Sequence, residues 1–328
     1  MSTVRLLRDR VSGSRPRLSR STFALLSLGA ATVALVTLAP AAASAADSCC
    51  DKAKAIGEAC KHPCCVAATS LRTICFKCNA EKATSCCDKA AVKGGSCAHP
   101  CCVEAQKVGV LCAKCNKGRP LAFFDGKSLA FWETRKDSGK KETWVVGKPG
   151  LAKPGDHALA VEKGDGAMVN SCGGEHGLGR DFVSKATFGD ALIEVDVMVP
   201  KDSNSGVYVH GEYEIQVLDS FGKTKLGNGD MGAVYGAAPP PLNASKAPGE
   251  WQTYEIDFRA PRFDGDGKKT ENARFVSIKL NGKLLHENLE LKGPTPGGVS
   301  GKEAAVGPLM FQGNHGEVAY RNIFVTPR

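Results

Sequence analysis

Polar side chains alternate along the segment from Asn204 to Ser220, which reads NSGVYVHGEYEIQVLDS. One set of alternate positions carries a phenol, an imidazole, two carboxylates and an amide: Tyr208, His210, Glu212, Glu214 and Gln216. The other set, from Val207 to Val217, is apolar apart from Gly211. Because side chains of an extended strand point alternately to its two sides, the pattern predicts one strand with a packed face and a polar face. Two carboxylates beside an imidazole would crowd on a solvated face, so we interpret the polar face as the floor of a cleft, with a solvated sheet surface as the alternative.

A second set of reactive residues is a tandem repeat that contains 14 of the 15 cysteines, between residues 49 and 115. Its two copies are displaced by 37 residues, and each follows the pattern C-C-x9-C-x-H-P-C-C-x9-C-x2-C. The first copy contains Cys49, Cys50, Cys60, His62, Cys64, Cys65, Cys75 and Cys78. The second contains Cys86, Cys87, Cys97, His99, Cys101, Cys102, Cys112 and Cys115.

Two chemistries fit this repeat. Small cysteine-dense units of exported proteins are usually held by disulfides, which is the interpretation that we favour. Seven cysteines per copy then require a bond between the copies or a free thiol in each. Alternatively, seven thiolates and one imidazole would fill two tetrahedral zinc sites per copy. Haem attachment is disfavoured, because asparagine follows Cys78 and Cys115 where the attachment motif has histidine.

The N-terminal residues, 1–45, are predicted to be a secretory signal peptide. An arginine-rich front end precedes the apolar run from Phe23 to Leu38, and Ala43-Ser44-Ala45 supplies a small-residue cleavage site. We therefore expect an exported protein, periplasmic or extracellular, without a stable membrane span after cleavage. The composition then divides the mature chain into the cysteine repeat, residues 46–118, and a second domain, residues 119–328.

The net charge argues against a polyanionic partner. The whole chain carries a formal charge of +9, but the signal segment contains six arginines and one aspartate, so about +4 remains after its removal. No cluster of basic residues interleaved with aromatics follows, which argues against nucleic-acid binding. The cysteine repeat offers no acid or hydroxyl constellation, and we interpret it as a scaffold, a metal-binding module or a site for an envelope or protein partner.

The second domain is predicted to be all-β. Residues 191–199 and 251–259 alternate between apolar and polar side chains, and so do residues 318–325 near the C-terminus. In residues 274–285, Asn281-Gly282 separates two apolar runs, which is a strong hairpin signal. Several strands with glycine- and proline-rich turns and no long helical period indicate a two-sheet sandwich or jelly roll.

Five ordered blocks of this domain resemble the 3-keto-disaccharide hydrolases, whose members are also called 3-keto-glucoside 1,2-lyases with 3-keto-glucal hydratase activity. The blocks are FDGKSL with Trp132, NSGVYVHGEYEIQVLDS, GDMGAVYG, NASK with GEWQ, and GPL with Gln312, His315-Gly316 and YRNI. The resemblance covers about residue 121 to the C-terminus and none of the cysteine repeat. It implies a concanavalin-like jelly roll and exported chemistry on an oligosaccharide or glycoside.

The chemistry of that family also suggests which residues act. A ketone at C3 acidifies the hydrogen at C2, so a base can remove it, the group at C1 can leave, and water can add to the alkene. The candidate catalytic residues are His210, Glu212, Glu214 and His315, and the first three could instead hold a divalent metal that stabilises the enolate. The candidate substrate-binding residues are Tyr208, Gln216, Asp230, Tyr235, Lys246, Gln312 and Arg321. Gln216 stands where the similar β-glucanase strand has a carboxylate, which disfavours retaining hydrolysis. A noncatalytic glycan-binding jelly roll is the alternative function.

Overall fold

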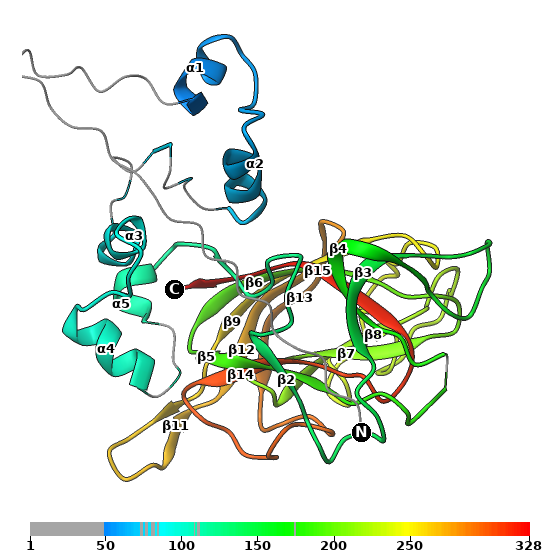
Figure 1. The fold of residues 1–328 in the computed structure, drawn as a ribbon. Helices are drawn as coiled ribbons and strands as arrows, with labels where there is room; N and C mark the ends of the chain where they lie inside the picture. Colours follow the sequence, from blue (N-terminus) through cyan, green and yellow to red (C-terminus); the bar gives the residue numbers. More distant parts are fainter. Residues whose placement is uncertain are drawn as a thin grey trace, which may run out of the picture. The chain divides into compact units, whose positions relative to one another are not determined.

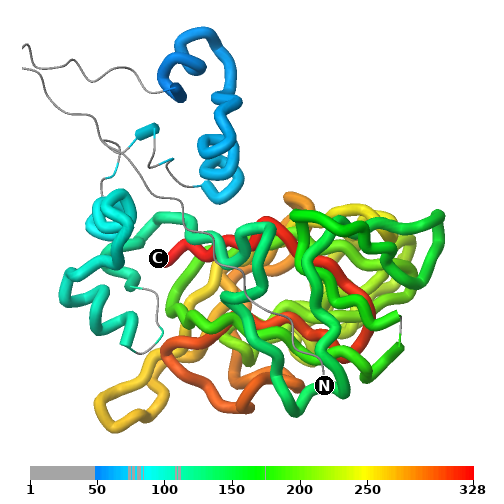
Figure 2. The backbone as a smooth tube through the Cα atoms, viewed as in Figure 1, coloured from blue at the N-terminus to red at the C-terminus, as the bar shows by residue number. Residues whose placement is uncertain are grey.

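The computed structural model describes residues 49–328 except 73–74, 76–77, 80–82, 84, 108, 110–111 and 174. The predicted signal peptide lies outside the described residues. Short helices precede residue 117 and strands follow it (Figure 1). Figure 2 shows the course of the backbone through both parts. Among the helices of the described part of the chain, none has the length and apolarity needed to cross a lipid bilayer.

The two cysteine repeats fold into short helices at equivalent positions. In the first repeat α1 spans Cys49–Ala55 and α2 spans Pro63–Ser70; in the second, α3 spans Cys86–Val92, α4 spans Pro100–Lys107 and α5 spans Ala113–Asn116. The helices α2 and α4 each begin at a proline. Proline is tolerated there because the first backbone N–H of a helix has no partner within the helix. The repeat therefore presents its adjacent cysteine pairs at the starts of helices.

The second domain is an all-β jelly-roll sandwich of the concanavalin-like type, as the sequence predicts. Its eight-stranded sheet has the order β13-β12-β9-β6-β15-β4-β3, with β1 paired to β15, and its five-stranded sheet has the order β2-β5-β14-β7-β8. The first sheet contains β1 (Leu121–Ala122), β3 (Trp144–Gly150), β4 (Ala160–Asn170), β6 (Ala191–Met198), β9 (Gln252–Arg259), β12 (Ala273–Leu280), β13 (Lys283–Leu291) and β15 (Val318–Pro327). The second contains β2 (Trp132–Thr134), β5 (Phe182–Phe188), β7 (Asn204–Val209), β8 (Tyr213–Leu218) and β14 (Gly307–Phe311). A separate ribbon pairs β10 (Arg262–Phe263) with β11 (Lys269–Glu271).

The core of the domain is formed by the apolar sides of both sheets. Stacked rings contribute to it: Phe311 of β14 lies 4.9 Å from Trp132 of β2 and 3.9 Å from Tyr320 of β15, between ring centroids. The predicted Asn281-Gly282 hairpin is confirmed, because these two residues join β12 and β13 with φ angles of 52° and 75°. Both residues thus adopt the left-handed conformation that a two-residue hairpin turn of this kind requires.

The prediction of one continuous strand from Asn204 to Ser220 is wrong. The segment reverses after Val209 and forms the hairpin β7–β8, in which Val209 pairs with Tyr213. The three residues between them make the turn, and two of these, His210 and Gly211, have φ angles of 56° and 70°. A left-handed backbone at two successive residues cannot continue an extended strand, so the predicted row of polar side chains is interrupted at its centre.

Candidate active site

The β7–β8 hairpin brings Tyr208 and Glu214 together on one face of the five-stranded sheet. The two residues are direct partners in the antiparallel register, and so are Gly206 and Gln216. Directly opposed residues of antiparallel strands share a face, so all four lie on the same side. Residues of the other face, among them Val207 and Ile215, belong to the hydrophobic core. The polar side chains therefore occupy the outer face of this sheet.

Glu214 is a buried carboxylic acid with a shifted titration. Its exposed fraction is only 3%. Burial raises its pKa to about 7, and the negative charge of Asp181 adds to the increase, whereas a hydrogen bond from the Tyr208 side chain opposes it. The carboxylate fits only because residue 206 is a glycine: a Cβ there would lie 2.3 Å from Glu214 Oε1. At neutral pH this group is present in both its protonated and its ionised form.

Two further residues of this face, Asp181 and Arg135, were not among the sequence candidates. Asp181 precedes β5, accepts a hydrogen bond from the Gly313 N–H (3.0 Å) and lies 3.7 Å from the Arg135 guanidinium. Burial nevertheless raises the pKa of Asp181. The Arg135 guanidinium also donates to the Gly297 carbonyl, over 3.1 Å. Neither residue belongs to a sequence block that stands out, and only the pairing of β2, β5 and β14 brings them to Glu214.

Gln312 and Tyr208 complete the polar cluster around Glu214. The Gln312 side-chain amide lies 3.4 Å from the Tyr208 hydroxyl, which also donates to the Pro296 carbonyl over 3.1 Å. Burial and the neighbouring Glu214 charge raise the pKa of Tyr208 far above its usual value, so its hydroxyl stays protonated. We call the set Arg135, Asp181, Tyr208, Glu214 and Gln312 the Glu214 cluster.

Glu212 lies in the hairpin turn and anchors a loop. Its Oε1 accepts hydrogen bonds from the backbone N–H of Ser300 (2.8 Å) and from the Ser300 hydroxyl (2.7 Å), and its Oε2 accepts one from the Gly301 N–H (2.9 Å). The Thr295 N–H donates to the Glu212 carbonyl as well. Both oxygens of this buried carboxylate are therefore engaged by protein donors, in the manner of a structural acid.

His210 is also in the turn, but its imidazole is packed among aromatic rings. The ring centroid lies 5.3 Å from that of Phe188 and 4.7 Å from that of Phe258. Its Nε2 lies 3.2 Å from the Gly189 carbonyl, and its Nδ1 has no hydrogen-bond partner in the structure. Burial lowers its pKa to about 4. The structure thus separates His210 and Glu212 from the face that carries Glu214, and the three do not converge on a common metal position.

His315 follows β14 and lies beside a second histidine. Its ring centroid is 4.7 Å from that of His176, and its Nδ1 contacts the Asn314 side chain. Burial, with the nearby His176, lowers the pKa of His315. Neither of these two contacts involves Glu214.

The remaining predicted binding residues are divided between the two sheets. Gln216 donates to Asn204 Oδ1 over 2.5 Å, on the same face as Glu214, and the Tyr235 N–H donates to the Glu214 carbonyl. Asp230 is buried and forms an ion pair with Lys223 over 2.7 Å.

Lys246 and Arg321, in contrast, both contact Trp251. The Lys246 ammonium donates to the Trp251 carbonyl, and the Arg321 guanidinium lies 4.0 Å above the indole ring. Arg321 also pairs with Asp196, its register partner on β6 (3.3 Å). These two cations are thus engaged on the eight-stranded sheet.

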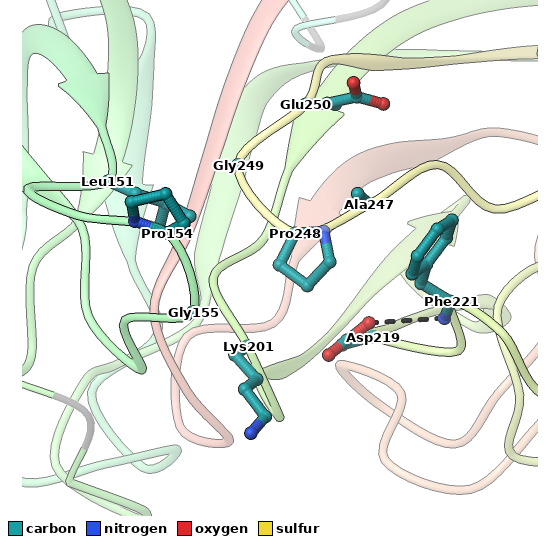
Figure 3. Close-up of a pocket in the computed structure, with 10 residues that line it drawn as sticks. All are labelled: Leu151, Pro154, Gly155, Lys201, Asp219, Phe221, Ala247, Pro248, Gly249 and Glu250. Atoms are coloured by element: carbon teal, nitrogen blue, oxygen red, sulfur yellow. Dashed lines mark hydrogen bonds between the residues drawn. The ribbon is translucent and has the colours of Figure 1, made fainter.

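Two cavities of the domain differ in their relation to Glu214. A cavity of about 580 Å³ is lined by Leu151, Pro154, Lys201, Asp219, Phe221 and Pro248, among others, and does not contain Glu214 (Figure 3). A cavity of about 430 Å³ is lined by Tyr235, Thr295 and Pro296, among others. Each of these three residues hydrogen-bonds to the backbone of Glu214 or to the Tyr208 hydroxyl. We therefore regard the smaller cavity, and not the larger one, as the approach to the Glu214 cluster.

The cysteine repeats contain candidate metal sites but no disulfides in the structure. The Sγ atom of Cys64 lies 3.2 Å from that of Cys75, 3.5 Å from that of Cys78 and 4.0 Å from that of Cys65. A disulfide bond measures about 2.05 Å and joins one sulfur to one other. The favoured disulfide interpretation is therefore not what the structure contains, because its sulfurs converge in clusters instead of pairing.

Four groups of metal-ligating residues lie in the repeats, and none lies in the described part of the sandwich. They are Cys49, Cys50, Cys60 and Cys65; His62, Cys64, Cys65 and Cys78; Cys86, Cys87, Cys102 and Cys115; and Cys101, Cys102, Cys112 and Cys115. The divalent metal expected in the jelly roll thus has no ligand group of this kind among the described residues.

Residues 120–326 match the sequence profile of the 3-keto-alpha-glucoside-1,2-lyase-like domain family. The match covers more than half of the chain. The chain belongs to this family. The resemblance found in the sequence is thereby confirmed, and membership of the 3-keto-alpha-glucoside-1,2-lyase-like family supports a carbohydrate-active enzyme or a carbohydrate-binding protein. No curated protein matches the sequence.

Two solved structures from Parabacteroides distasonis ATCC 8503, each assigned as a glycosyl hydrolase, are similar to this chain. The first is 27% identical with a TM-score of 0.49, over 64% of this chain and 84% of the other. The second is 17% identical with a TM-score of 0.43, over 64% of this chain and 94% of the other. Both TM-scores lie below 0.5, so the evidence for the Glu214 cluster is the geometry of this chain alone.

Proposed function

We propose that the chain cleaves 3-keto-glucosides by removing the C2 proton, eliminating the group at C1 and hydrating the product. The observation that carries the proposal is Glu214. It is a buried acid whose pKa lies at about 7, on the outer face of a sheet and next to a tyrosine that stays neutral. A general base works best when its pKa is near the working pH, because it is then both ionised and basic enough.

In this mechanism Glu214 transfers a proton, and Tyr208 stabilises the negative charge that develops on the substrate. The Glu214 carboxylate removes the proton from C2, and the electrons of the C–H bond enter the adjacent ketone as an enolate. The neutral Tyr208 hydroxyl turns from the Pro296 carbonyl to donate its hydrogen bond to the enolate oxygen on C3, where negative charge develops. The enolate then collapses to form the C1–C2 double bond as the C1–O bond breaks. The glycosidic oxygen leaves with the proton that Glu214 carries.

Hydration completes a net hydrolysis. Water adds across the double bond, with its hydroxyl on C1 and its hydrogen on C2, so the products are the 3-keto sugar and the free aglycone. Glu214, ionised again after the elimination, is positioned to accept a proton from the incoming water. The negative charge of Asp181 raises the Glu214 pKa, and the Arg135 guanidinium beside Asp181 offsets part of that charge. The ion pair therefore limits how far the Glu214 pKa rises.

We also propose that the protein acts outside the cytoplasm, after export by its N-terminal segment. The arginine-rich start, the apolar run and the small-residue cleavage site support export. Recovery of the chain from the periplasm or medium, beginning near Ala46, would be the expected result. Recovery of the full-length chain from the cytoplasm alone would contradict it.

The reaction is tested by running it in deuterium oxide. Elimination followed by hydration places one solvent deuterium on C2 of the sugar product, whereas direct hydrolysis leaves C2 unlabelled. We expect release of the aglycone with deuterium at C2, and no release from the matched glucoside that lacks the ketone. Unlabelled product would overturn the elimination mechanism, and binding of the 3-keto-glucoside without any product would favour a glycan-binding module.

A further inference from the structure

The candidate metal groups of the cysteine repeats share ligands. Each repeat contributes two groups of four side chains, and within every group the ligand atoms lie within 4.8 Å of one another. Four soft donors at this separation suit a tetrahedral ion, since zinc–sulfur bonds of about 2.3 Å place the sulfurs of one site about 3.8 Å apart. The two groups of a repeat therefore describe two neighbouring ion positions.

One position of the repeat belongs to both groups in each copy. Cys65 is common to the two groups of the first repeat, and Cys102 and Cys115 are common to the two groups of the second. The shift of 37 residues makes Cys102 the equivalent of Cys65, and this is the only position present in all four groups. Both side chains are buried, with 2% exposure. This cysteine thus lies at the centre of each cluster.

A shared cysteine also explains why each repeat has seven cysteines. Two separate four-sulfur sites need eight thiolates, whereas two sites that share one thiolate need seven. In the second repeat the group Cys101, Cys102, Cys112 and Cys115 is entirely cysteine. Its Cys112 is equivalent to Cys75, whose Sγ lies 3.2 Å from that of Cys64. Cys75 can therefore replace His62 in the first repeat, which leaves a set of seven thiolates. In the second repeat the two groups contain six cysteines, and the seventh is Cys97, the equivalent of Cys60, which would take the place of Cys115 in the group with Cys86 and Cys87.

We propose that each repeat binds two zinc ions in a thiolate cluster bridged by one sulfur, that of Cys65 in the first repeat and of Cys102 in the second.

Outer donors to the same sulfurs recur in both repeats. The Asn79 side-chain amide donates to Cys50 Sγ (3.3 Å), and the equivalent Asn116 amide donates to Cys87 Sγ (3.9 Å). His62 Nδ1 lies 2.8 Å from Cys64 Sγ, as the equivalent His99 Nδ1 lies 2.9 Å from Cys101 Sγ. Hydrogen bonds from outer groups to ligand atoms are typical of metal sites, where they orient the ligands and offset their charge. We assign the histidines to this role.

The first measurement is made on the full wild-type chain, reduced and loaded with metal without oxygen. We expect four zinc ions per chain, one for each ligand group. After exchange for cadmium-113, we expect resonances of four-sulfur sites in pairs split by cadmium–cadmium coupling through the bridging sulfur. Half that amount of zinc, or uncoupled resonances, would overturn the bridge. A chain isolated fully disulfide-bonded that takes up no zinc after reduction would overturn the metal site itself.

Three single variants distinguish the bridge from the other ligands. Cys65→Ser should lower the zinc content by two ions and remove the coupled pair of the first repeat. Cys60→Ser, the matched control in a terminal ligand, should lower it by one. His62→Ala should leave the zinc content and the coupling unchanged. Equal losses for Cys65→Ser and Cys60→Ser would contradict a shared thiolate. The coupling is measured on the wild-type chain, so it does not depend on whether a variant folds.

Discussion

The strands of the β7–β8 hairpin and the turn that joins them each bury a glutamate, and the two carboxylates have opposite surroundings. Both carboxylate oxygens of Glu212, in the turn, accept hydrogen bonds. The donors are the N–H and hydroxyl of Ser300 and the N–H of Gly301. Glu214 on the strand faces a phenol and a second acid, and burial raises its pKa to about 7. A carboxylate saturated by backbone donors holds structure, whereas one left with few donors is poised to exchange a proton.

The difference between Glu214 and Glu212 should have its largest effect on catalysis. Glu214→Gln should lower kcat/KM for a 3-keto-glucoside by about 10²–10⁴-fold, because it removes the proposed base without changing the shape of the side chain. Steady-state release of the aglycone measures this loss. Glu212→Gln, the matched change in the turn, should retain activity within about tenfold at temperatures where it is folded. Equal losses in both variants would remove the distinction between strand and turn.

The raised pKa of Glu214 should also appear in stability. Between pH 4.5 and about 7 the unfolded chain releases this proton while the folded chain keeps it, so the free energy of unfolding falls as pH rises. The total loss is about 3 kcal/mol, and Glu214→Gln should lack it. Urea unfolding of both proteins across this range gives the difference. If the difference in unfolding free energy between the two proteins did not change with pH, the raised pKa of Glu214 would be contradicted.

His210 should give a pH dependence of the opposite sign. Its folded pKa is about 4 against 6.5 for an unperturbed imidazole, so the unfolded chain binds this proton first as pH falls. Stability should therefore drop by about 3 kcal/mol between pH 6.5 and 4, and His210→Leu should remove this slope whatever its absolute stability. In the wild type the slopes of Glu214 and His210 oppose each other between pH 4.5 and 6.5, so only the variants reveal them. Parallel curves for wild type and His210→Leu would place the imidazole in water.

The smallest of the four effects concerns the loop that Glu212 anchors. Glu212→Gln replaces an acceptor by an amide NH₂ that cannot accept from the Gly301 N–H, so we expect a loss of about 1–3 kcal/mol in the free energy of unfolding. Thermal or urea unfolding at neutral pH measures it. Ser300→Ala, which removes one of the two donors to Oε1, should cost less. Unchanged stability in both variants would show that the loop does not depend on this carboxylate.

Most of the fold could be predicted from the sequence, because local signals specify it. Alternation located β6, β9 and β15, and Asn281-Gly282 located the β12–β13 turn, since these residues tolerate the required left-handed backbone. The reversal at His210 was missed for a geometric reason. Three residues separate the paired residues that flank the turn, so side chains that are an even number of positions apart stay on the same face. Tyr208 and Glu214 therefore share a face in the hairpin, as they would in one straight strand. Gly211, the single gap in the apolar set, was the only local sign of the turn.

The composition of the site was less predictable than the fold. Asp181 and Arg135 approach Glu214 through pairing between strands far apart in sequence, which no local pattern encodes. His210 and Glu212 have the residue types of a catalytic site, but the turn directs one toward aromatic rings and the other toward a loop. Residue type and spacing therefore pointed to this segment, but of its three candidate acid–base groups only Glu214 belongs to the Glu214 cluster.

The residue types at positions 206 and 214 depend on each other. The Glu214 carboxylate occupies the space that a Cβ at residue 206 would need, so any side chain there would displace the acid. In the course of divergence, residue 206 can gain a side chain only in a lineage that has moved or lost the glutamate. A glycine facing an acid across these two strands is therefore a signature by which relatives that keep the proposed base can be recognised, and a larger residue at the glycine would mark a relative in which this acid has moved or been lost.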